Sequence, residues 1–356
     1  MNLQSLFEHS PEVSGVENHQ APGKAATGLC QLPDGRRLAW DEYGSPQGFP
    51  LFYCHNHAGT RLEGLFFHDS ARAAGFRLIA VDRPGLGLSD FFSRSDQNSC
   101  AEDFLQLANH LGIRRFGLLS WGGGGAFAFA LSLRAPTRVM FQISLACLPF
   151  SLARDRSALS WHEGFKRGCL RGLLQLRCRL MRPWPGKGSC RQRLLEQLNL
   201  PDRKLLERRE VMDLITENFR ESSRQGSRGP ARDLASRFSR WRFDPASLQV
   251  PVQLWQGIAD PLVSEACTRM LAQSLPRVEW HRVPAAGHLF FLRDGDAVFR
   301  SARKLLDQQA ESGLDAVVRK RSAGVRTSVR TPGFQPVHGN AACRLPLPSG
   351  VVARSP

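Results

Sequence analysis

Short apolar runs alternate with segments of helical period along most of this chain, and this alternation restricts the fold more than any other feature. The apolar runs cover residues 50–54, 76–81, 115–119, 139–145, 252–255 and 278–283. Helical patterns separate them at 61–74, 101–111, from the glycine run to 133, at 265–274 and at 296–309. Strands that alternate with helices form a parallel sheet with helices on both faces. We therefore predict an α/β fold with a mostly parallel central sheet, preceded by a hairpin at 30–40 whose turn is Asp34-Gly35.

The alternation stops at about residue 150 and resumes at about 250. Residues 151–250 carry 22 Lys and Arg against 11 Asp and Glu, whereas residues 1–150 carry 12 against 13. This change predicts a basic helical lid inserted into the core. The predicted domains are a flexible leader at 1–28, a core at 29–149 and 250–310, the lid at 150–249 and a disordered basic tail at 311–356.

Several protein classes are not indicated. No run approaches the roughly 18–20 apolar residues of a membrane-spanning helix. The N-terminal region lacks the pattern of a secretory signal, so we expect a cytoplasmic protein. The nine cysteines are scattered without a C-x-x-C pair, which indicates neither a disulfide framework nor a zinc site. No motif for a bound cofactor is present, and none is expected.

Four motifs stand at the ends of predicted strands. They are His-Asn-His-Ala-Gly-Thr-Arg at 55–61, Val-Asp-Arg-Pro-Gly-Leu-Gly-Leu-Ser at 81–89, Gly-Ile-Ala-Asp-Pro-Leu-Val at 257–263 and Ala-Gly-His-Leu at 286–289. In this order, around an inserted lid, they resemble the α/β-hydrolase superfamily in its epoxide-hydrolase, esterase and acyltransferase branches. The resemblance covers roughly residues 29–305 and implies the α/β-hydrolase fold.

The resemblance also implies a catalytic acid and a catalytic base. Asp260 matches the triad acid and His288 matches the base. Hydrolases of this kind need a nucleophile on a strained turn, a histidine that takes its proton and a carboxylate that orients the histidine. Because both residues follow the last two predicted strands, their side chains can meet at the carboxyl edge of the sheet.

The expected nucleophile motif G-x-S-x-G is altered. The chain reads Leu-Ser-Trp-Gly-Gly-Gly-Gly at 119–125, so an ungapped match places Ser120 on the first glycine and Gly122 on the nucleophile. If the turn is displaced, Ser120 is the nucleophile, as a similarity to the S-W-G-x-G-G motif of the rhamnolipid-precursor acyltransferases implies. If it stays in register, Gly122 takes the strained position, Ser120 and Gly124 are its small neighbours, and no hydroxyl lies at the tip. The size of Leu118 favours the in-register alternative, and both remain open.

An oxyanion hole needs two converging backbone N–H groups. The resemblance places one at His57 and the other after the nucleophile, at Trp121 or Gly123. Asn56 stands where the family usually has glycine. His55 and His57 form an H-x-H pair without a nearby third ligand, so no metal is expected.

An apolar stripe with intervening arginines spans residues 165–180. A basic amphipathic helix can lie on an anionic membrane surface or dock an acidic carrier protein, and the alternative is a lid helix with solvated arginines. No nucleic-acid recognition motif accompanies the charge, and no such partner is expected.

These features together predict a serine-hydrolase-type enzyme acting on a small-molecule acyl ester or thioester, with Ser120 as nucleophile, His288 as base and Asp260 as its orienter. Hydrolysis and acyl transfer differ only in the acceptor, which the sequence does not distinguish. The alternative is a hydrolase-fold protein without a nucleophile, which binds a ligand or uses Asp260 and His288 as a non-covalent acid/base pair.

Overall fold

The computed structural model describes residues 27–147, 196, 198–236, 241 and 243–325. The chain divides into two compact units, residues 1–309 and 310–356, and the sheet belongs to the first. Nearly all of the predicted leader, the basic stripe at 165–180 and most of the predicted tail lie outside the described residues.

An eight-stranded sheet forms the centre of the first unit, in the order β1-β2-β4-β3-β5-β6-β7-β8. β1 and β2 are antiparallel, β2 is antiparallel to β4, and the remaining neighbours are parallel. The strands are β1 (Gly28–Gln31), β2 (Arg37–Gly44), β3 (Phe49–Cys54), β4 (Phe76–Val81), β5 (Phe116–Trp121), β6 (Val139–Leu145), β7 (Val252–Gly257) and β8 (Val278–Val283). The predicted mostly parallel sheet and the hairpin are confirmed, with Gly35 at a φ of 85° in the hairpin turn.

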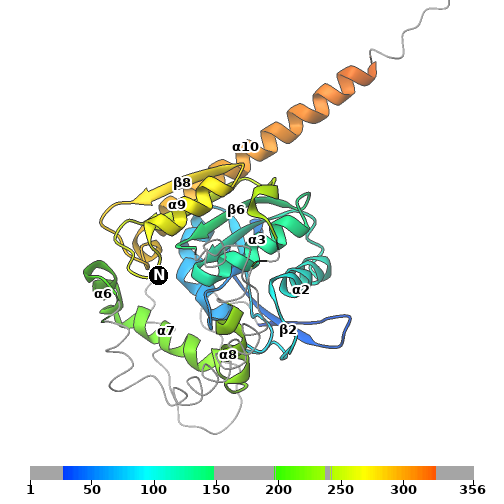
Figure 1. The fold of residues 1–356 in the computed structure, drawn as a ribbon. Coiled ribbons are helices and arrows are strands. Elements are labelled where there is room, and N and C mark those ends of the chain that lie inside the picture. The colour runs from blue at the N-terminus through cyan, green and yellow to red at the C-terminus, as the bar shows by residue number, and fades with distance from the viewer. Residues whose placement is uncertain (1–26, 148–195, 197, 237–240, 242, 326–356) are drawn as a thin grey trace, which may run out of the picture. The chain divides into compact units, whose positions relative to one another are not determined.

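Helices cover both faces of the sheet because its central strands are apolar on both sides. One buried cluster contains Leu118 of the sheet together with Phe104 and Leu271 from helices. The helices that pack against this face are α2 (Gln97–His110), α3 (Gly125–Arg134) and α9 (Glu265–Ser274). A second cluster joins Leu119 and Trp121 to Phe299, and packs α1 (His68–Ala73) and α10 (Phe291–Val325) against the other. Figure 1 shows α2 and α3 together on one side of the strands.

Some helix boundaries differ from the predicted ones. The segment predicted as one helix over 61–74 divides into a 3-10 helix, η2 (Arg61–Phe67), and α1. α2 begins earlier than predicted, because Asp96 and Ser99 form a reciprocal cap in which each side chain accepts the other's backbone N–H, at 2.8 and 2.9 Å. The helix predicted over 296–309 is longer at both ends and extends to Val325 as α10.

Three helices are described between β6 and β7, in the segment where a lid is predicted. They are α6 (Leu200–Leu206), α7 (Arg209–Ser222) and α8 (Arg228–Ser236), and Figure 1 shows them following one another along one side of the sheet. A 3-10 helix, η4 (Pro245–Ser247), leads back to β7.

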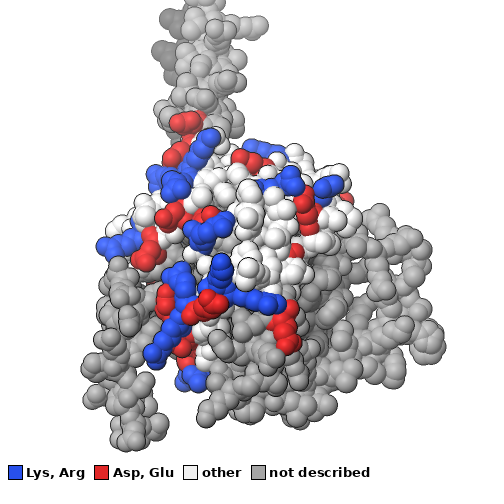
Figure 2. All heavy atoms as spheres, turned by 90° about the vertical axis from the view of Figure 1, so that its left-hand side faces the viewer, with Lys and Arg blue, Asp and Glu red and all other residues white. Residues whose placement is uncertain are grey.

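The charged side chains of the face drawn in Figure 2 are mixed in sign, with Lys and Arg interspersed among Asp and Glu. Exposed residues form pairs of low energetic value, such as Arg303 with Asp307 at 3.1 Å. Among the described residues, no helix has the length and apolarity that crossing a bilayer requires.

Candidate active site

Asp260 and His288 lie side by side after β7 and β8. Oδ2 of Asp260 is 2.8 Å from Nδ1 of His288, and both residues are buried, at 8% and 3% exposure. Oδ1 of Asp260 accepts the backbone N–H groups of Leu262 and Val263 at 2.8 and 3.0 Å, which fixes the carboxylate in its turn. Because a carboxylate only accepts, Nδ1 of His288 carries a proton and donates a hydrogen bond to Asp260. In neutral His288, the free lone pair is therefore on Nε2.

The loop that carries His288 is held by a residue that the sequence did not single out. The Asp202 carboxylate on α6 accepts the backbone N–H groups of His288 and Leu289 at 2.7 and 2.9 Å. A Cβ added at Gly287 would lie 2.1 Å from the Asp202 carboxylate. Glycine at 287 thus permits this approach, and a helix of the predicted lid segment orients the histidine.

β5 ends later than predicted, and this decides where Ser120 points. Ser120 and Trp121 still pair with Ser144 and Leu145 of β6, so the strand continues through Trp121. Ser120 is fully buried, and its hydroxyl donates to Oγ of Ser144 at 2.9 Å.

The side chains of Ser120 and Trp121 lie on opposite faces of the sheet because strand side chains alternate. The Trp121 ring is 5.5 Å from the ring of His288, on the face of the second cluster. Ser120 shares the face of Leu118, which belongs to the first cluster. The structure therefore brings Asp260 and His288 together and does not bring Ser120 to them.

Gly122 occupies the turn between β5 and α3. Its φ is 52°, the left-handed region that glycine adopts without cost. It opens a 3-10 helix, η3 (Gly122–Gly124), that leads into α3. A Cβ added at Gly124 would lie 2.0 Å from the carbonyl oxygen of Cys54, so this turn favours glycine two positions after Gly122. This geometry agrees with the in-register alternative, in which no hydroxyl stands at the tip.

The backbone N–H groups of His57 and Gly123 converge on one point. Both donate to Oδ1 of Asn56, at 2.8 and 2.9 Å. Two of the three predicted oxyanion-hole residues are thus brought together, whereas Trp121 belongs to the strand. A side chain of the chain itself takes the acceptor position between them.

The loop after β3 is fixed by buried polar groups. Both ring nitrogens of His55 are hydrogen-bonded, one to the carbonyl oxygen of Asn56 at 2.8 Å and one to the backbone N–H of Arg83 at 3.2 Å. Burial lowers the pKa of His55, so its ring is neutral and serves the loop rather than a ligand. Glu63 accepts the backbone N–H of Asn56 at 2.9 Å and the Tyr53 hydroxyl at 2.8 Å, and burial raises the pKa of Glu63 to about 7.

α8 reaches the same loop through Asp233. Its carboxylate accepts the backbone N–H of Ala58 at 2.7 Å and the Arg83 guanidinium at 2.7 Å. The Nδ1 atom of His57 lies 3.4 Å from it. Positively charged Arg83 and the neighbouring His57 hold the pKa of Asp233 well below its usual range despite its burial. Asp233 therefore stays ionised and ties α8 to the loop.

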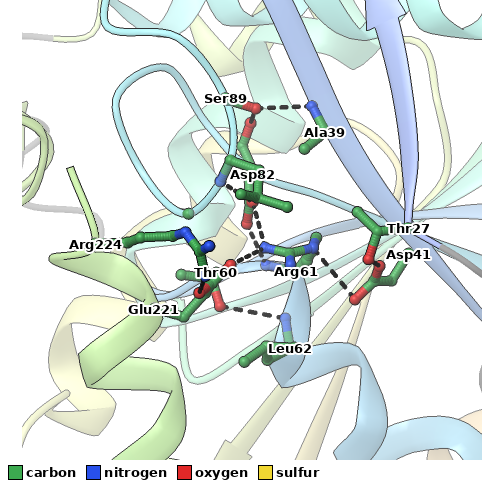
Figure 3. A network of polar contacts seen from close by, with 12 residues as sticks. Thr27, Ala39, Asp41, Thr60, Arg61, Leu62, Asp82, Ser89, Glu221 and Arg224 are labelled. Atoms are coloured by element: carbon green, nitrogen blue, oxygen red, sulfur yellow. Dashed lines mark hydrogen bonds and ion pairs between the residues drawn. The ribbon is translucent and has the colours of Figure 1, made fainter. Parts of the chain in front are cut away.

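α7 reaches the loop through a second buried network, drawn in Figure 3. Arg61 lies 2.7 Å from carboxylate oxygens of both Asp82 and Glu221 and 3.3 Å from Asp41. Burial raises the pKa of Asp82 to about 6, although Arg61 opposes this. Asn218 of α7 adds a hydrogen bond between uncharged groups, in which its Oδ1 accepts the backbone N–H of Thr60 at 2.9 Å. Asp82 and Arg61 belong to motifs that the sequence analysis quoted, whereas their α7 partners carried no recognisable signal.

Sequence comparison matches residues 44–301 to the alpha/beta hydrolase family. A stretch of 120 residues is 38% identical to the dihydrolipoyllysine-residue acetyltransferase component of an acetoin cleaving system from Pseudomonas putida, covering 33% of this chain and 30% of that protein. The chain thus spans about a third of the length of the curated relatives that it matches.

Solved structures share the fold over most of the chain. A thermophilic esterase from Thermogutta terrifontis has a TM-score of 0.57 at 20% identity, covering 80% of this chain and 99% of that one. An esterase from Exiguobacterium antarcticum has a TM-score of 0.60 at 16% identity, covering 78% and 98%. With more than half of its length matched to the family and this sheet order, the chain belongs to the alpha/beta hydrolase family.

Proposed function

We propose that this hydrolase-family protein uses Asp260 and His288 as a non-covalent general-base pair on a bound small molecule, without a serine intermediate. The supporting observations are the absence of a side chain at Gly122, the left-handed turn residue, and an intact acid–histidine pair joined at 2.8 Å. The esterases among its structural neighbours make a small organic molecule the expected substrate class.

In this mechanism Asp260 holds the Nδ1–H of His288, so Nε2 takes a proton from water or from an acidic group of the substrate. Burial of both residues limits competing hydrogen bonds from solvent. The imidazolium that forms is stabilised by the adjacent carboxylate, and the proton returns to the product or to water. Asp202 orients the histidine and takes no part in proton transfer.

The second candidate, an acyl-transfer enzyme with Ser120 as nucleophile, has only the Ser-Trp-Gly-Gly motif in its favour. Ser120 already donates to Ser144 on the other face of the sheet, so acting as nucleophile would require β5 to rearrange. A carrier protein or an anionic membrane as partner remains a prediction from residues 165–180, which lie outside the described part of the chain.

Fluorophosphonate labelling separates the two candidates. We expect the folded wild-type protein to stay unlabelled, because a fluorophosphonate needs an activated hydroxyl. For a substrate found in a screen of epoxides and other small non-acyl molecules, turnover should fall by about 10²–10⁴-fold in His288→Ala and stay within about twofold in Ser120→Ala. Labelling that disappears in Ser120→Ala would establish the serine mechanism instead. Ligand binding without any turnover would favour a binding protein.

A further inference from the structure

The side-chain amide of Asn56 occupies the point on which the backbone N–H groups of two residues converge. Its Oδ1 accepts the N–H groups of His57 and Gly123 at 2.8 and 2.9 Å. Two backbone donors that converge on one acceptor form the arrangement that stabilises an oxyanion in acyl transfer. Here both donors are already satisfied from within the chain.

The Asn56 side chain also occupies the space that a side chain at position 122 would need. A Cβ added at Gly122 would lie 2.4 Å from Oδ1 of Asn56 and 2.8 Å from its Cγ. Real Cβ atoms do not approach other atoms this closely, so a serine at 122 and the observed position of Asn56 exclude each other. The observed position of the Asn56 side chain therefore depends on a glycine at position 122.

Asn56 is held in this position from its backbone. Its N–H donates to Glu63 at 2.9 Å, and its carbonyl oxygen accepts from the buried Arg83 at 2.8 Å. The two donors also determine the orientation of the amide, because only Oδ1 can accept them. Nδ2 consequently faces away from the hole, and no described residue accepts a hydrogen bond from it.

We propose that Asn56 is a built-in occupant of the oxyanion hole, so that acyl transfer is blocked at two positions, 56 and 122, and not only by the missing hydroxyl. This inference rests on the proposed function, because it explains why His288 has to act without an oxyanion-stabilising site. Asn56 thereby determines specificity, in that carbonyl substrates that need oxyanion stabilisation are rejected.

Four proteins test the proposal: wild type, Gly122→Ser, Asn56→Gly and the double variant, each shown to be folded by circular dichroism. Hydrolysis of p-nitrophenyl butyrate and fluorophosphonate labelling are measured. In the double variant the introduced hydroxyl attacks the ester carbonyl and its proton passes to Nε2 of His288. p-Nitrophenolate then leaves, and water hydrolyses the acyl-enzyme to butyrate.

We expect the double variant to exceed Gly122→Ser by at least about 100-fold, since loss of one oxyanion donor alone costs roughly 10²–10³ in rate. Asn56→Gly alone should stay well below the double variant, because at position 122 it has no hydroxyl that could form an acyl-enzyme. Addition of His288→Ala to the double variant should abolish the activity. If Gly122→Ser equals the double variant, or if the folded double variant is inactive, Asn56 does not block the hole.

Amide hydrogen exchange gives a second measurement that needs no catalysis. In Asn56→Gly, exchange of the Gly123 N–H should accelerate at least about tenfold, because its acceptor is lost. Unchanged exchange would overturn the proposal. The exchange measurement does not depend on whether wild-type Ser120 reacts, so failure of the proposed function is detected separately, by labelling of the wild type.

Discussion

Glu63 should make the folded protein less stable as the pH rises from 5 to 8. The residue is 3% exposed, and burial raises its pKa from 4.5 to about 7. The folded state thus holds the proton more tightly than the unfolded chain does. The associated stability is fully present below pH 4.5 and is lost as the pH rises through 7.

The size of this effect follows from the two pKa values. At about 1.4 kcal/mol for each pKa unit, the full shift corresponds to about 3 kcal/mol. Part of this loss of folding free energy occurs below pH 5, and most of it is complete by pH 8. The decrease in stability between pH 5 and pH 8 is therefore about 2–3 kcal/mol. For a domain of this size, that amounts to a decrease of roughly 5–8 °C in melting temperature.

The Glu63→Gln variant isolates this contribution, because the amide has nearly the same shape and does not titrate. Its nitrogen would face Nδ2 of Asn218, which now donates to Glu63 at 3.1 Å, so the variant should lose about 1–3 kcal/mol at every pH. Chemical denaturation at pH 5, 6, 7 and 8 should show wild type approaching the variant as the pH rises.

The control is Glu102→Gln on the surface, where pairing with Arg134 lowers the pKa of the carboxylate. Glu102 is therefore ionised throughout the window, and its variant should run parallel to wild type. Parallel curves for wild type and Glu63→Gln would refute the assignment of a raised pKa to Glu63.

Three further variants test the packing around the site. Arg61→Met should destabilise the fold by about 3–5 kcal/mol, since it removes the guanidinium that pairs with the buried carboxylates of Asp82 and Glu221. A loss below 1 kcal/mol in urea unfolding would contradict the role of this ion cluster. Asp202→Asn should reduce stability by about 1–3 kcal/mol in thermal unfolding, because the amide oxygen can accept only one of the backbone N–H groups of His288 and Leu289. An unchanged melting temperature would argue against this contact. Gly124→Ala should cost at least about 1–3 kcal/mol, because its Cβ would lie 2.0 Å from the carbonyl oxygen of Cys54, and a variant as stable as wild type would show that the turn can move away from β3.

Much of this protein could be predicted from local patterns. Runs such as 76–81 and 139–145 are strands in the structure because they are apolar throughout and bounded by turn residues, as strands covered on both faces must be. Asp260 and His288 were found because the motifs that contain them resemble those of a hydrolase family, and both follow parallel strands whose carboxyl ends meet at one edge. Boundaries were less accurate: the segment 61–74 contains two helices, since the direction of the chain at η2 depends on the tertiary contacts of Arg61.

The sequence by itself determined the fold class and the absence of a side chain at Gly122, because these depend on periodicity and on residue type at one position. It indicated the acid–histidine pair through motifs that resemble those of a hydrolase family. Only the tertiary structure decided that Ser120 points away from His288, because pairing with β6 extends β5 by two residues beyond the predicted end. It also decided that Oδ1 of Asn56 accepts the two N–H groups that we propose as an oxyanion hole. That outcome requires three groups from two distant segments, Asn56, His57 and Gly123, to converge within 3 Å, and no local pattern encodes such a meeting.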